Sequence, residues 1–285
     1  MKVIAAVLLA ATVGLVAPLR AEPFELGGRT LEIPVPEGYV KVTDDMRELK
    51  RLSDQLVDPL NDTLAFYIPR SSAPVALAGG LPPLDRYFLA KTEKRLRAVT
   101  VSAPEFAEMR QRIRAQNKQV FEEAKAKLQV FKEAKAKLPG YLEQISRNIK
   151  REHDLDVDLG DLRMIPLEPH QDVPVAVAYS MLMAVGRREG KGPTPLRPTT
   201  VTIMNANGRV IFLYAYGTQA DLAWTRDASA AWQTAISTHN PPPPERKANG
   251  WSMDWAQVGW TALGGAVIGG LAVLLAEFFA RKKQA

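Results

Sequence analysis

The sequence predicts an α+β fold: an antiparallel sheet with packed helices, a long protruding helical arm and one C-terminal transmembrane helix. Three observations predict it. Short apolar runs rich in β-branched and aromatic residues lie on both sides of one long helical stretch. Helical spacing from 102 to 152 continues far beyond the roughly 8 to 20 residues of an ordinary globular helix. The 19 residues from Val258 to Ala276 carry no charge, a length that spans a bilayer core as a helix.

The first 21 residues have the features of a signal peptide. Lys2 gives a positive start, Val3 to Val16 form an apolar core, and Leu19 to Ala21 form a small-residue cleavage site. We therefore expect cleavage between Ala21 and Glu22 and export of the body. The alternative is an uncleaved N-terminal anchor, but the apolar core is shorter than the ~17 to 25 residues that a span needs.

The body, residues 22–240, is expected to begin with a strand and a helix. Asp44 is placed to cap a helix whose apolar residues recur at helical spacing as far as Pro59. Dense or alternating apolar runs predict the strands. These are Leu31 to Val35, Leu64 to Ile68, and an alternating segment within Arg86 to Leu96 that follows the loop Gly79 to Pro83.

A capping box opens the helical arm, residues 102–152. The Ser102 hydroxyl and the Glu105 carboxylate are spaced to satisfy each other's exposed amides. A ten-residue tandem repeat follows, Val120 to Gln129 and Val130 to Pro139. Because ten residues displace equivalent side chains by about 80° around a helix, the two copies cannot share one narrow stripe. We interpret the arm as a solvated, coiled-coil-like extension, and a spacer role is favoured over partner binding.

The second half of the body is expected to return to strands and to end in a helix. Asn207-Gly208 marks a tight turn between two of these strands, which makes them antiparallel neighbours. An amphipathic helix near Gln219 to Ser237 is expected to cover one sheet face. The strands are Leu162 to Leu167, Val173 to Val185, Thr199 to Met204 and Val210 to Tyr216.

This order of elements resembles the Mog1/PsbP-like α+β fold. The resemblance rests on the strand Leu31 to Val35 with its exit through Pro36 to Tyr39, and on the final hairpin and helix. The arm departs from the compact pattern of that fold. Because that fold mostly serves binding and assembly, the resemblance implies a module without catalysis.

The C-terminal segment, residues 255–280, is the predicted transmembrane helix. Tryptophans cluster at its start, and Arg281 to Lys283 close it as a positive-inside stop, so the tail, residues 281–285, is expected to be cytoplasmic. A stiff proline-rich linker, residues 241–254, holds the body off the membrane. The body is then expected on the extracytoplasmic side of a bacterial inner membrane. The alternative is a buried core helix, which would seldom end in a charged triplet.

Small residues line one side of this segment. Gly265 and Gly269, with Ala266 and Gly270, recur at steps of four, a spacing that lets two helices approach closely. We expect this face to support self- or hetero-association, although the spacing also arises by chance in single-span helices. The lipid bilayer is the other expected partner.

Charge and composition exclude several classes of protein. The chain has 37 Lys and Arg against 31 Asp and Glu, but five of the basic and two of the acidic residues lie outside 22–250, which leaves 32 against 29. The basic excess therefore belongs mostly to targeting and topology, and no nucleic acid is expected as a partner. The absence of cysteine excludes disulfides and thiolate metal sites.

No catalytic, cofactor or metal site is predicted. The three histidines stand apart in the sequence, and the aspartates from Asp154 to Asp161 lack the glycine and glutamate of a calcium-binding loop. No nucleophile elbow, phosphate-binding loop or dinucleotide motif occurs.

The leading hypothesis is therefore a non-catalytic, membrane-anchored module that binds another envelope component. The alternative is a tethered hydrolase or small-ligand-binding protein whose site forms only on folding. That alternative predicts a concave site that gathers His170, Asp or Glu side chains, and without such a site it should be dropped.

Overall fold

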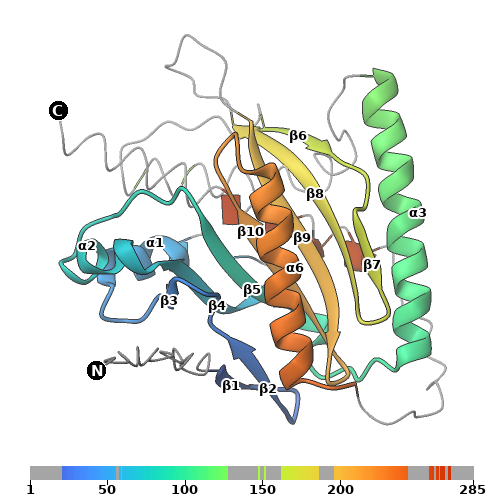
Figure 1. Ribbon diagram of the computed structural model, residues 1–285, viewed down its shortest axis with the longest axis horizontal. Helices are drawn as coiled ribbons and strands as arrows, with labels where there is room; N and C mark the ends of the chain where they lie inside the picture. Colours follow the sequence, from blue (N-terminus) through green and yellow to red (C-terminus); the bar gives the residue numbers. More distant parts are fainter. Residues whose placement is uncertain are drawn as a thin grey trace, which may run out of the picture.

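The computed structural model describes residues 21–55, 58, 60–127, 147, 151, 162–185 and 196–242, together with 257–259, 261–262, 264–266 and 269–270. A large twisted sheet lies between two covering layers, with α6 across its front and the described residues of 257–270 behind it (Figure 1). The prediction of an α+β fold built on an antiparallel sheet is confirmed.

The main sheet is antiparallel in every pairing. Its strand order is β3-β4-β5-β10-β9-β8-β6, with β7 also paired to β8, while β1 and β2 form a separate hairpin. The strands are β1 (Ala21–Leu26), β2 (Arg29–Pro34), β3 (Tyr39–Lys41), β4 (Asn61–Pro69), β5 (Tyr87–Glu93), β6 (Leu162–Pro166), β7 (Gln171–Val173), β8 (Ala176–Val185), β9 (Arg197–Ala206) and β10 (Arg209–Tyr216). The helices are α1 (Arg47–Gln55), α2 (Ala73–Leu77), α3 (Ala103–Lys127) and α6 (Leu222–His239), with short 3₁₀ turns at η1 (Arg70–Ser72) and η2 (Lys94–Leu96).

The central hairpin of β9 and β10 turns at Asn207 and Gly208, as predicted. Their φ angles of 49° and 78° are both positive, which a tight two-residue hairpin turn requires and which asparagine and glycine tolerate best. Successive side chains of β10 then point to opposite faces of the sheet. Tyr214 and Tyr216 consequently lie on one face and Leu213 on the other.

The front face is covered by α6 and the β1–β2 hairpin. The Trp232 indole of α6 is buried and donates its Nε1 hydrogen to the Pro34 carbonyl at 2.8 Å, which joins the helix to β2. The Thr202 and Ser229 hydroxyls meet at 2.7 Å and satisfy each other between β9 and α6. The predicted amphipathic helix over a sheet face is therefore confirmed.

The rear face is covered by α1, α3 and the described part of 257–270. The predicted capping box opens α3: the Ser102 backbone amide donates to Glu105 Oε2 at 2.8 Å, and the Glu105 amide donates to Ser102 Oγ at 3.4 Å. The main buried contacts of this layer come from Met46, Leu49 and Leu52 of α1, Phe106, Met109 and Ile113 of α3, and Val258, Ala262 and Ala266 of the C-terminal segment.

One expectation about the elements is wrong. The sequence places the cap of the first helix at Asp44, whereas α1 begins at Arg47, because a turn closed by the Met46 amide on the Thr43 carbonyl (3.0 Å) comes first. The strand expected within Arg86 to Leu96 is confirmed as β5, which is buried along its whole length because both faces of the sheet are covered. The strands β1, β3 and β7 and helix α2 have no counterpart among the expected elements.

Several sequence predictions lie outside the described residues. They concern positions 1–20 of the signal peptide, the second repeat copy Val130 to Pro139, the acidic run Asp154 to Asp161, most of the linker 241–254 and the tail 281–285. Within the part of the chain that the structure describes, no helix combines the length and the hydropathy needed to cross a membrane.

Candidate functional site

Three tyrosines from neighbouring strands form a row on the rear of the sheet, which we call the tyrosine face (Tyr87, Tyr214 and Tyr216). Tyr216 of β10 lies directly opposite Tyr87 of β5, and their rings stack with centroids 4.3 Å apart and planes 1° apart. The Tyr214 ring follows at 6.2 Å from that of Tyr216. Burial raises the pKa of all three phenols well above 10, so each remains a neutral hydrogen-bond donor.

Each hydroxyl of the tyrosine face donates to a main-chain carbonyl of the C-terminal segment. Tyr214 donates to the carbonyl of Ala262 at 3.0 Å and Tyr216 to that of Ala266 at 2.9 Å. Tyr87 donates to the carbonyl of Gly269 at 2.9 Å. The three acceptors stand at positions i, i+4 and i+7, which share one side of a helix, and each carbonyl has a second lone pair for such a bond. The tyrosine face therefore binds the main chain of a helix.

Glycine is required where this helix meets the tyrosine rings. A methyl group at Gly265 would overlap the Tyr214 hydroxyl, and one at Gly269 would overlap the Tyr216 hydroxyl and lie 2.6 Å from Leu89 Cδ1. A methyl group at Gly264, by contrast, meets no atom within 4 Å. The close approach thus depends on particular glycines and not on the glycine content of the segment.

Further contacts fix the start of the segment beside β5 and α3. Arg95 Nη1 donates to Gln257 Oε1 at 2.9 Å, and Asn61 Nδ2 donates to the Thr261 carbonyl at 3.3 Å. A methyl group at Gly259 would lie 3.7 Å from Ile113 Cγ1 of α3. The segment therefore runs along β5, from Arg95 just beyond its end to Tyr87 at its start.

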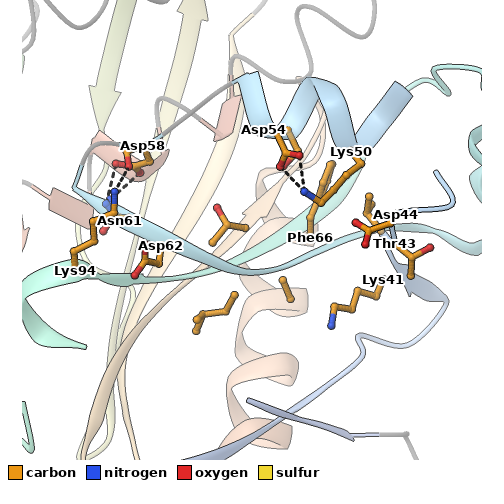
Figure 2. A pocket seen from close by; sticks show the side chains of 15 residues that line it. Lys41, Thr43, Asp44, Lys50, Asp54, Asp58, Asn61, Asp62, Phe66 and Lys94 are labelled. Atoms are coloured by element: carbon orange, nitrogen blue, oxygen red, sulfur yellow. Dashed lines mark hydrogen bonds and ion pairs between the residues drawn. The ribbon is translucent and has the colours of Figure 1, made fainter. Parts of the chain in front are cut away.

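A separate cavity of about 570 Å³ opens between β4 and α1 (Figure 2). Four aspartates line it, but Asp54 pairs with Lys50 at 2.5 Å and Asp62 approaches Arg97 at 3.5 Å. A register shift between Thr63 and Ala65 marks a bulge in β4, in the part of that strand that β3 does not pair. Charged side chains and a bulge are devices that protect an edge strand from pairing. No group of three or more potential metal ligands occurs among the residues that the structure describes.

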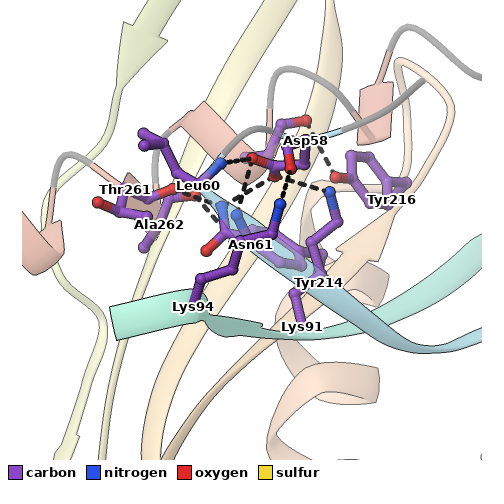
Figure 3. A network of polar contacts seen from close by, with 10 residues as sticks. Asp58, Leu60, Asn61, Lys91, Lys94, Tyr214, Tyr216, Thr261 and Ala262 are labelled. Atoms are coloured by element: carbon purple, nitrogen blue, oxygen red, sulfur yellow. Dashed lines mark hydrogen bonds and ion pairs between the residues drawn. The ribbon is translucent and has the colours of Figure 1, made fainter. Parts of the chain in front are cut away.

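Asp58 links this cavity to the C-terminal segment through a buried polar network (Figure 3). Its carboxylate pairs with Lys91 of β5 at 3.0 Å, and both side chains are only 3% exposed. It also accepts the backbone amides of Leu60 and Asn61 at 3.0 and 3.1 Å. Burial lowers the pKa of Lys91, and the neighbouring Asp58 carboxylate opposes that shift. An ion pair is therefore held out of water beneath the segment.

The histidines do not join these groups. His170 precedes β7, so strands β5, β10, β9 and β8 separate it from the cavity beside β4. Partial burial and the Arg226 charge lower its pKa to about 4. His239 lies at the end of α6, with Nδ1 2.8 Å from the Ala235 carbonyl, and His153 lies outside the described residues. Of the side chains named for the hydrolase alternative, the cavity therefore gathers aspartates, and His170 lies elsewhere.

The structure brings the four predicted helix-association residues together on the rear of the sheet. Gly265 and Gly269 meet the tyrosines, Ala266 is fully buried, and a methyl group at Gly270 would lie 2.6 Å from Met183 Cε. Association through this face in a membrane stays a prediction.

The predicted cleavage residues lie at the start of β1. Ala21 pairs with Pro34 and Glu22 with Ile33, and cleavage between Ala21 and Glu22 stays a prediction.

Sequence reasoning did not identify the tyrosine face. The available signal was the alternation Tyr214-x-Tyr216 in a strand with two covered faces, since a buried tyrosine hydroxyl needs a partner. The partners themselves are main-chain carbonyls, which no sequence motif marks.

Comparison of the chain with protein-family models and with curated proteins gives no match. The function is therefore argued from the geometry.

Proposed function

We propose that this chain is a single-pass, membrane-anchored protein whose body lies on the extracytoplasmic side of a bacterial inner membrane and serves as a non-catalytic binding or assembly module for another envelope component. Residues 255–280 are the proposed anchor, and the tyrosine face is the proposed binding surface. The signal-like first 21 residues, the uncharged run and the basic tail support the topology.

One observation carries the binding role. Three buried hydroxyls on adjacent strands donate to three carbonyls on one side of a helix, and glycines stand where the rings come closest. Such a surface recognises a helix with small side chains, because bulkier residues would separate the rings from the carbonyls. It offers no nucleophile, and its phenols stay protonated.

The anchor and the docked segment are the same part of the chain. To enter a bilayer, residues 257–270 must leave the tyrosine face. The bilayer and the rear of the sheet would each bury the same apolar helix, which carries small residues along one side. The two states differ in what covers the sheet. In the anchored state the tyrosine face is free to bind.

Cell fractionation and protease protection test this proposal. We expect the full chain in the membrane fraction, with the body digested when protease reaches the extracytoplasmic side and a tag after Ala285 protected. A body that resists protease until the cytoplasm is opened would contradict the topology. Turnover of a substrate by the purified protein, with no protein recovered through the body, would contradict the binding role.

A further inference from the structure

The contacts on the tyrosine face do not depend on the identity of the docked side chains. The hydroxyls of Tyr87, Tyr214 and Tyr216 bind carbonyls, which every helix has. The side chains matter only through their size, at Gly265 and Gly269. Any apolar helix with glycines at this spacing meets the same requirements, so the chain's own segment is one example of a class.

We propose that the tyrosine face, once residues 257–270 have left it for the bilayer, binds a partner's transmembrane-type helix: an apolar helix with glycine at the positions of 265 and 269 and glycine or alanine at those of 262 and 266. This rests on the proposed function for the departure of the segment. The chain's own segment then acts as an intramolecular competitor that keeps the face covered until the anchor inserts.

The polar residues beneath residues 257–270 suit a surface whose bound helix can be exchanged better than they suit a permanent core. The Lys91–Asp58 pair lies under it, and burying such a pair costs free energy that well-packed apolar residues would not cost. Departure of the segment returns both charges to water, which offsets part of the apolar exposure. Asn61 likewise exchanges a long 3.3 Å bond to the Thr261 carbonyl for water.

The rest of the body does not rely on this occupant. The front face is closed by α6 and the β1–β2 hairpin, through Trp232 and a separate set of buried residues. On the rear face, α1 and α3 contribute their own buried side chains on either side. A vacated tyrosine face therefore lies on the same side of the sheet as α1 and α3. Its exposed apolar floor favours a new helix over water.

A binding measurement with the full chain in mild detergent tests this proposal. The probe is a fluorescent, lysine-flanked peptide with the sequence of residues 255–272. The chain carries Gly265→Ala and Gly269→Ala, which force its own segment from the face. The matched chain carries Gly264→Ala, whose added methyl group meets no neighbour.

We expect the peptide to bind the first chain at least about tenfold more tightly than the matched chain, because the matched chain keeps its face occupied. A peptide with the same two alanine substitutions should bind at least about tenfold more weakly than the unsubstituted peptide. Equal affinity for both chains, or for both peptides, overturns the proposal.

A second measurement guards against misfolding of the doubly substituted chain. Amide hydrogen exchange across β9 and β10 should match that of the matched chain, and adding Tyr216→Phe should weaken peptide binding about fivefold to tenfold through loss of one hydrogen bond. Unchanged affinity after Tyr216→Phe also overturns the proposal. Binding in detergent is independent of cellular location, so this test and the protease test fail separately.

Discussion

Substitution of one glycine in the docked segment should release it from the sheet, while substitution of a near neighbour should not. The added methyl group of Gly269→Ala overlaps the Tyr216 hydroxyl and lies 2.6 Å from Leu89 Cδ1, whereas that of Gly264→Ala meets nothing within 4 Å. Both changes raise helix propensity equally, by up to about 1 kcal/mol. The comparison therefore isolates packing against the tyrosine face.

The magnitude follows from two contacts. Inserting a methyl group into a close-packed site costs about 1–3 kcal/mol, and displacing the Tyr216 hydroxyl loses part of a bond worth about 0.5–1.5 kcal/mol. We expect Gly269→Ala to weaken docking by about 2 kcal/mol, which is about thirtyfold in the docking equilibrium. For Gly264→Ala we expect only the propensity gain, at most about 1 kcal/mol, and no weakening of docking.

An engineered disulfide measures this equilibrium. The chain has no cysteine, so Ile113→Cys with Gly259→Cys introduces a single pair of thiols, at positions where a Gly259 methyl group would lie 3.7 Å from Ile113 Cγ1. The same methyl group would lie 2.6 Å from Gln116 Oε1, the end of a flexible side chain, so Gln116 must shift equally in every variant compared. The fraction oxidised in a glutathione buffer gives the effective concentration of one thiol at the other. Equal effective concentrations for Gly264→Ala and Gly269→Ala would refute the docking geometry.

Three further perturbations test other parts of the account. Lys91→Met leaves the Asp58 carboxylate buried without its cation, so it should lower the free energy of unfolding in urea by about 3–5 kcal/mol. Adding Asp58→Asn to the same chain should restore much of that free energy. No recovery would contradict a stabilising ion pair between Lys91 and Asp58. The Arg86 guanidinium and Thr218 hold the pKa of Asp221 well below its usual range, so this carboxylate contributes stability above about pH 4 that is lost as the pH falls further. Asp221→Asn should therefore lower the free energy of unfolding at pH 7 by about 1–2 kcal/mol and make that free energy less dependent on pH in the acid range. An unchanged pH dependence in the acid range would exclude this role. Asp172 pairs with both Arg110 and Arg114 and so joins β7 to α3. Asp172→Asn should therefore speed amide hydrogen exchange in β7 while β9 stays protected. Equal exchange rates in β7 of the substituted and unsubstituted chains would show that these ion pairs do not hold β7.

Local signals in the sequence predicted much of the fold. The Asn207-Gly208 turn and the capping box at Ser102 and Glu105 form as expected, because each depends on backbone chemistry within a few residues. The helix over the sheet is predicted equally well by its apolar periodicity. The first helix cap was misplaced because a turn at Thr43 precedes it.

Of the candidate site, the sequence predicted the small-residue face of the segment but not the tyrosines that bind it. The small residues at 265 and 269 mark a face built for close approach, and that inference holds whether the neighbour is a helix or a sheet. The neighbour itself depends on strand pairing, since Tyr87 and Tyr216 meet only through the register of β5 with β10, more than a hundred residues apart in the sequence. Long-range register leaves no local mark, so the tyrosine face emerges only from the folded chain.

Site-specific photo-crosslinking in intact cells tests the central claim most directly. An aliphatic diazirine residue in place of Met183 puts the reactive group where Met183 Cε lies, 2.6 Å from a methyl group built at Gly270. We expect crosslinks to the chain's own segment 257–270, or to a membrane protein's helix with glycines at the spacing of Gly265 and Gly269. Crosslinks confined to lipid, or to proteins without such a helix, would contradict the claim that this face binds small-faced helices.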